Sequence, residues 1–166
     1  MKRSTAAVGW ALAAALTLLT SQPSAQTAPG VLSERCYLRE YDAAHLVAHP
    51  AQTVRALAVQ VVRMADTPDV LEHSIAAQFI DADAVFAHTG LVHHGWYGLE
   101  CDGGRYRAKP YRQGILLTVD PDYPPTLGDC GADSDEAPAR TISGRGEDDR
   151  FYLPEVDCGT LPAKWR

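Results

Sequence analysis

Hydrophobic and polar residues alternate on both sides of a Gly-rich turn in the middle of the chain. Leu99 and Cys101 alternate with a polar residue before Asp-Gly-Gly at 102–104, and Tyr106 and Ala108 alternate with basic residues after it. A period of two is typical of half-buried strands, and Gly supplies the positive φ that tight hairpin turns need. The pattern therefore predicts a β-hairpin that turns at the two glycines.

Further strands are expected on both sides of this hairpin, because short apolar or alternating stretches are bounded there by Gly, Pro and Asp. They lie at 36–41, 54–64, 115–119 and 150–153, with a short strand at 141–142. Three other stretches are expected to lack regular structure: a polar lead-in at 26–34, a loop at 88–95, and a solvated acidic region at 129–149 around the short strand.

Asp42 is suited to N-cap a short helix over 43–47, which has to end before Pro50. Residues 70–87 fit helical and strand spacing equally well and stay unassigned. The sequence thus predicts a mainly β protein, with α+β as the alternative. The expected architecture is a small antiparallel β-barrel or sandwich with one or two short helices and two disulfides.

The first 25 residues have the pattern of a secretory signal peptide. Lys2 and Arg3 precede an apolar run over 6–19, and small residues lead to an expected cleavage after Ala25. The apolar run is shorter than a typical membrane span. We therefore expect a single mature domain, 26–166, of 141 residues, with no stable membrane span and a periplasmic or secreted location.

All four cysteines lie after the expected cleavage site. An even number of cysteines in an exported chain indicates disulfides, and four cysteines allow three pairings. The expected pairing joins neighbours in sequence order, Cys36–Cys101 and Cys130–Cys158.

The chain is acidic, with a net charge of −6 that becomes −8 once the two N-terminal basic residues are removed. Nucleic-acid binding is not expected, because phosphate contacts supply most of that affinity. Against this background, Arg105, Arg107, Lys109 and Arg112 form a basic cluster, and the first three would share one face of a strand. This face is a candidate docking surface for an anionic partner, such as a polyanionic glycan or an acidic protein. The alternative is a solvated face that pairs with the acidic loops.

Metal and catalytic motifs are incomplete. His45 and His49 have the spacing of two ligands on one helical turn, which makes them weak candidates for a metal site. Leu46 stands where a zinc-protease motif has Glu, and no complete ligand set lies nearby, so no metal is expected. Ser74 beside His73 lacks the Gly-x-Ser-x-Gly elbow of hydrolases. We expect no catalytic residues and no cofactor.

Two resemblances extend this interpretation. The stretches 41–54, 101–104 and 148–153, closing on Cys158, resemble a group of small uncharacterised secreted bacterial proteins. That resemblance covers most of the mature chain, implies no activity and suggests a bacterial periplasm.

The second resemblance is confined to one loop. Ser143-Gly144-Arg145-Gly146 is similar to the Ser-Gly-x-Gly-like inhibitory loop of periplasmic inhibitors of C-type lysozyme, which are small disulfide-bonded β-barrels. The acidic residues at 147–149 differ from the aromatic or basic residue expected there in that family.

The leading functional hypothesis is an exported, non-catalytic periplasmic binding protein for a protein or an anionic cell-envelope component. A lysozyme-inhibitor-like protein is one alternative, and an envelope hydrolase or metal-binding protein is another. These hypotheses differ in one structural respect. An enzyme needs a pocket where reactive polar groups converge, whereas a binding protein needs only a complementary surface.

Overall fold

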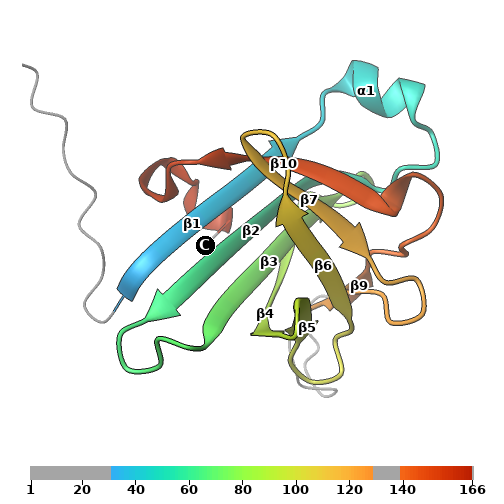
Figure 1. Ribbon diagram of the computed structural model, residues 1–166. Helices are drawn as coiled ribbons and strands as arrows, with labels where there is room; N and C mark the ends of the chain where they lie inside the picture. Colours follow the sequence, from blue (N-terminus) through green and yellow to red (C-terminus); the bar gives the residue numbers. More distant parts are fainter. Residues whose placement is uncertain (1–30, 129–138, 166) are drawn as a thin grey trace, which may run out of the picture.

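Eight antiparallel strands form a closed barrel in the computed structural model, which describes residues 31–128 and 139–165. The strands follow one another around the barrel in the order β1, β10, β7, β6, β5, β4, β3 and β2 (Figure 1). Their bounds are β1 Val31–Glu40, β2 Val54–Met64, β3 Leu71–Phe79, β4 Val85–His93, β5 Trp96–Leu99, β6 Arg105–Pro110, β7 Gly114–Val119 and β10 Arg150–Val156. The predicted mainly β fold is confirmed, and of the two predicted architectures the protein adopts the barrel.

Smaller elements connect or cover the barrel. The helix α1 (Ala43–Ala48) joins β1 to β2, and the predicted cap is confirmed, because the Asp42 side chain accepts a hydrogen bond from the backbone of His45. The other elements are a two-stranded sheet of β8 (Thr126–Leu127) and β9 (Arg140–Thr141), and the 3-10 helices η1 (Gly146–Asp148), η2 (Cys158–Thr160) and η3 (Ala163–Trp165). No helix within the described ranges is long and apolar enough to cross a membrane.

The main hydrophobic core fills the barrel between its two ends. The register of β2 against β3 sets Leu57 opposite Ala77 and Val59 opposite Ile75, and all four side chains are fully buried. Because alternate residues of a strand point to opposite faces, this register fixes which side chains of every neighbouring strand point inward. The predicted strand at 54–64 is therefore confirmed, with Leu57 and Val59 on its inward face.

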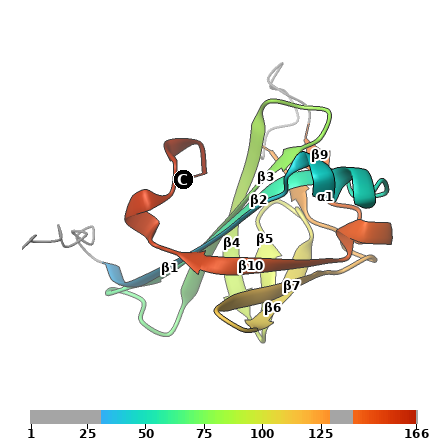
Figure 2. The same cartoon turned by 90° about the horizontal axis from the view of Figure 1, so that it is seen from above.

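A second apolar cluster lies outside the barrel, beneath the C-terminal segment (157–165). Leu161 and Trp165 of this segment are buried against Ala56, Ala58 and Ala76, which point outward from β2 and β3. Figures 1 and 2 show the C-terminal segment and α1 on opposite sides of the barrel. This part of the barrel wall is consequently buried on both faces.

Two predictions of secondary structure are corrected, and one stretch that the sequence leaves unassigned is now assigned. The lead-in expected at 26–34 contains the start of β1 at Val31, and the unassigned stretch 70–87 contains β3 and the beginning of β4. The loop expected at 88–95 is wrong for residues 88–93, which belong to β4. Gly90 lies within β4 because the strand comes very close to β5 there. A Cβ added to Gly90 would lie 1.9 Å from the carbonyl oxygen of Gly98 on β5. Glycine permits this close approach of the two strands.

The expected disulfide pairing is also wrong. Cys36 is bonded to Cys158, with a Cα–Cα distance of 5.2 Å, although the two residues are 122 positions apart. The end of β10 pairs with β1, with Val156 opposite Cys36, and this places Cys158 beside its partner. Cys101 is disulfide-bonded as well, and Cys130 lies outside the described residues.

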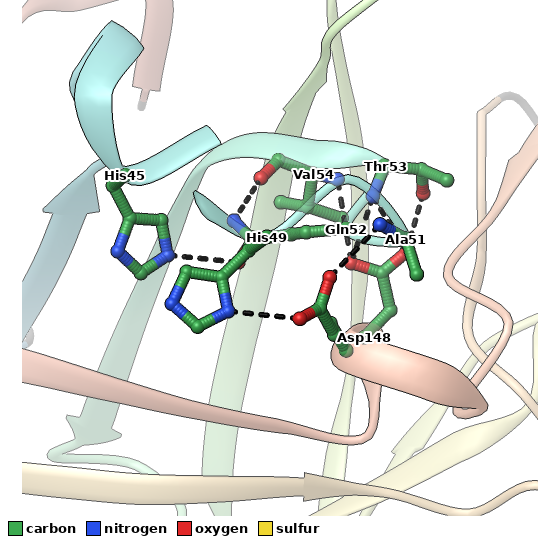
Figure 3. Close-up of polar contacts among 8 residues, drawn as sticks. His45, His49, Ala51, Gln52, Thr53, Val54 and Asp148 are labelled. Carbon is green, nitrogen blue, oxygen red and sulfur yellow. Dashed lines mark hydrogen bonds and ion pairs between the residues drawn. The ribbon is translucent and has the colours of Figure 1, made fainter. Parts of the chain in front are cut away.

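One end of the barrel, the covered end, is capped by the loop between α1 and β2 together with η1. Asp148 of η1 is fully buried, and its carboxylate accepts hydrogen bonds from the backbone N–H of Thr53, at 3.0 and 3.1 Å, and of Val54 at 3.4 Å (Figure 3). The Thr53 hydroxyl donates a further bond. The expectation that 129–149 is solvated is therefore wrong at Asp148, where protein donors replace water. Residues 129–138 lie outside the described ranges.

Candidate functional site

The opposite end of the barrel contains a cavity of about 410 Å³, which we call the barrel mouth. Side chains from six strands line it. They are the apolar Val61, Leu71, Ala108, Pro110 and Ile115, the aromatic Tyr37 and Tyr97, and the basic Arg35, Arg63 and Lys109. Its volume falls within the range of roughly 300–1,000 Å³ that is usual for small-ligand sites.

Strand register explains why charged side chains reach this cavity. Arg35 of β1 lies directly opposite Val61 of β2, and Val61 lies opposite the buried His73 of β3. Arg63 follows Val61 by two residues and so shares its face of β2. The inward faces of β1 and β2 are thus apolar in the middle of the barrel and carry arginine near the mouth.

The floor of the barrel mouth is a cluster of three rings. Tyr97 stacks on Tyr106 with 5.0 Å between ring centroids, and His73 meets the two tyrosines edge-on at 5.2 and 5.3 Å. The ring atom Nε2 of His73 lies 3.1 Å from the carbonyl oxygen of Gly98, which only accepts, so Nε2 carries the proton. Nδ1 then accepts a 2.9 Å hydrogen bond from the Tyr106 hydroxyl. Both nitrogens of His73 are therefore engaged.

Burial sets the protonation of these rings. It lowers the pKa of His73 to about 4, so the imidazole is neutral at neutral pH. Burial also raises the pKa of Tyr37 and of Tyr97, and it raises the pKa of the fully buried Tyr106 well above its ordinary value. The two tyrosines that line the mouth keep their hydroxyl protons and are able to donate hydrogen bonds.

The side chains of the barrel mouth suit binding better than catalysis. Among the described residues that line it there is no Ser, Thr, Cys, His, Asp or Glu, the groups that most often act as nucleophile or general base. His73, in the floor, already uses both nitrogens in hydrogen bonds. The cavity offers cations, hydroxyl donors and apolar walls instead.

The predicted basic face lies on the outer surface of β6. Tyr106 points inward opposite Val119, so Arg105, Arg107 and Lys109 alternate with it, as the sequence predicted. Arg105 binds the buried carboxylate of Asp120 at 2.7 Å, so its charge is compensated. We therefore expect reversal of Arg105 to destabilise the fold, contrary to the small effect that an unpaired surface charge would have.

The remaining members of the basic cluster lie in three different settings. The guanidinium of Arg107 lies 3.9 Å from the ring centroid of Trp96 on the outer surface. Arg112 lies over Tyr111 and Tyr152, at 5.1 and 5.8 Å, in the turn between β6 and β7. Lys109 starts from the outer face of β6, between the inward-pointing Ala108 and Pro110, and borders the barrel mouth at its rim. The four basic residues do not form one continuous site.

The weak metal candidates belong to the covered end. The rings of His45 and His49 stack at 4.2 Å (Figure 3). Nε2 of His45 is hydrogen-bonded to Gln52 at 3.0 Å, and Nδ1 of His49 to Glu147 at 2.9 Å. The hydrogen bond from His49 is the main reason that the pKa of Glu147 is lowered. These contacts connect α1 with η1, which is a structural role.

The loop that resembles lysozyme inhibitors also lies near the covered end. Ser143 and Arg145 are exposed, whereas Gly144 is buried with φ of 63°, and a Cβ added there would lie 2.7 Å from a methyl carbon of Val119. Gly146 also has positive φ, at 65°. The backbone therefore requires glycine at 144 and favours it at 146, whatever the loop binds, and lysozyme inhibition stays a prediction.

The residues that define the barrel mouth were not predicted from the sequence. Arg63 follows Leu57, Val59 and Val61 at intervals of two residues, so alternation places it on the same face of the strand. A charged residue on an otherwise apolar face could have indicated a polar site at that end of the strand. Arg35 had the same relation to Tyr37. No local pattern connects these residues with Tyr97, because only closure of the barrel brings the strands together.

Comparison with known proteins assigns no family: no protein-family model, curated protein or solved structure matches this chain.

Proposed function

We propose that this protein is an exported, non-catalytic binding protein that takes a component of the cell envelope into its barrel mouth. The observation that carries the proposal is the cavity itself. It is concave, it gathers side chains from six strands, and its lining combines apolar walls with a few polar groups, which is the usual composition of a small-molecule site.

The location is supported by the oxidised cysteines. Cys36 and Cys158 form a disulfide and Cys101 is disulfide-bonded. Disulfides persist in oxidising compartments such as the bacterial periplasm and are rare in the cytosol. A ligand drawn from the envelope would be accessible in that compartment.

Native mass spectrometry tests the proposal. The mature protein is incubated with a detergent-free extract of bacterial envelopes, and we expect a defined small-molecule adduct. Ala108→Phe and Leu71→Trp each add bulk inside the mouth and should reduce the adduct. Ala48→Phe, on the exposed end of α1, adds the same bulk at the covered end and should leave it unchanged.

Two outcomes would contradict the proposal. One is an adduct that persists at full intensity in both mouth variants while they remain folded, as judged by circular dichroism. The other is capture of protein partners with no small molecule bound, which would favour the protein-binding hypothesis.

A further inference from the structure

The barrel mouth carries positive charge in an otherwise acidic chain. Arg35, Arg63 and Lys109 line it, while the whole sequence has a net charge of −6. Charge of one sign around a concavity with low-dielectric walls concentrates the electrostatic potential there. The mouth is thus a local exception that would attract an anion.

Only part of this charge is compensated within the protein. Glu155 lies 3.3 Å from Arg35, but the two side chains are 46% and 64% exposed, so the pair is weak and a ligand can displace it. Among the described residues, no ion pair includes Arg63 or Lys109. Arg63 donates one hydrogen bond to the backbone carbonyl of Pro68, which leaves its charge unneutralised.

The other lining groups define the rest of the ligand. Val61, Leu71, Ala108 and Ile115 offer aliphatic walls and no hydrogen-bonding side-chain atoms. Below them, the stacked rings of Tyr97 and Tyr106 and the packed core close the barrel, so the apolar part of a ligand has limited depth. A small head group with one negative charge and a short hydrocarbon chain matches both features.

We propose that the barrel mouth binds a single-chain amphiphile with one carboxylate head group, held by the inward-pointing Arg63 and Arg35 with Lys109 at the rim, and a short aliphatic chain against the apolar walls. This inference rests on the proposed function, since it names the class of ligand for the same site. Arginine suits the head group because its planar fork forms two parallel hydrogen bonds with a carboxylate. Apolar burial then adds affinity in proportion to the chain that leaves water.

Isothermal titration calorimetry with three ten-carbon probes, each used below its micelle concentration, tests the inference. Decanoate carries the carboxylate, decanol has a neutral head and decyltrimethylammonium has a positive one. We expect decanoate to bind tightest and decyltrimethylammonium weakest. Raising the salt concentration should weaken decanoate binding and leave decanol binding nearly unchanged.

Charge-removing variants identify the head-group site. Arg63→Gln should weaken decanoate binding about tenfold, the factor expected from loss of one charged hydrogen bond, and should spare decanol. Lys109→Gln, an exposed position, should act in the same direction and keeps the test decisive if Arg63→Gln folds poorly. Arg145→Gln removes the same charge from an exposed loop near the covered end and serves as the matched control.

Two results would overturn the inference, and they bear differently on the proposed function. If decanol binds as tightly as decanoate in wild type and both variants, the mouth does not select carboxylates, although it still binds a ligand. If none of the three probes binds, the amphiphile class is wrong. The envelope-extract experiment then decides separately whether the mouth binds any small molecule.

Discussion

The buried His73 gives the fold a specific sensitivity to acid. Its pKa is lowered to about 4, first by burial and to a smaller extent by its electrostatic interaction with His88, while its hydrogen bond to Gly98 opposes the shift. In the unfolded chain the pKa returns to its ordinary value of 6.5. Between these two values the unfolded state binds the proton and the folded state does not, so the stability falls as the pH falls.

The magnitude follows from the two pKa values. Full protonation of the unfolded state against a neutral folded state costs about 3 kcal/mol, and lowering the pH from 7 to 5 already removes about 2 kcal/mol. That loss is a large fraction of the roughly 5–15 kcal/mol that stabilises a typical domain. Carboxylates contribute little in this interval, because their ordinary pKa values lie near 4.

Urea unfolding followed by circular dichroism at pH 7, 6 and 5 measures this effect. The His73→Gln variant is the control, because it keeps the other five histidines and removes the buried titrating group. Its stability at pH 7 is expected to be lower, since the hydrogen bonds to Gly98 and Tyr106 change. Its loss between pH 7 and pH 5 should nevertheless be about 2 kcal/mol smaller than that of wild type. Equal losses in the two proteins would show that His73 does not cause the loss of stability in acid.

Two further predictions concern the disulfide and the covered end. Replacing Cys158 by Ser opens a loop of 122 residues and should lower the free energy of unfolding, measured with denaturant, by up to about 5 kcal/mol by the chain-entropy model. Peptide mapping of the wild-type protein without reductant should recover Cys36 linked to Cys158. A peptide in which Cys36 is linked to Cys101 would contradict the structure. Asp148→Ala leaves buried backbone donors of Thr53 and Val54 unpaired and should cost about 3 kcal/mol. Asp149→Ala, at a half-exposed position, should cost less than about 1 kcal/mol, and equal melting temperatures for these two aspartate variants would show that the buried carboxylate is dispensable.

The sequence predicts most clearly the strands that are rich in β-branched residues. β2 is predicted with its observed bounds because it is rich in Val and because Leu57, Val59 and Val61 share one face, although residues 56–59 are all buried. β3 is ambiguous because residues 75–79 are all buried, with Ala76 covered by the C-terminal segment. Burial on both faces removes the alternation that distinguishes a strand from a helix.

Long-range contacts limit how much of the candidate site can be predicted from the sequence. The sequence offered no reason to bring Cys158 to Cys36, since the pairing depends on β10 closing the barrel against β1. The barrel mouth depends on the same closure, because its arginines and tyrosines come from strands far apart in the chain. The basic cluster at 105–112 was visible as local composition, yet the structure divides it among three settings.

The most direct test of the central claim is to locate the ligand on the protein. Backbone amide shifts of isotope-labelled mature protein are recorded by NMR during titration with decanoate. We expect the largest shifts to cluster at the barrel mouth, around Arg35, Arg63, Leu71 and Ile115, with saturation at one molecule per protein. Shifts centred on Arg107 and Trp96 or on the covered end, or the absence of saturable shifts, would contradict it.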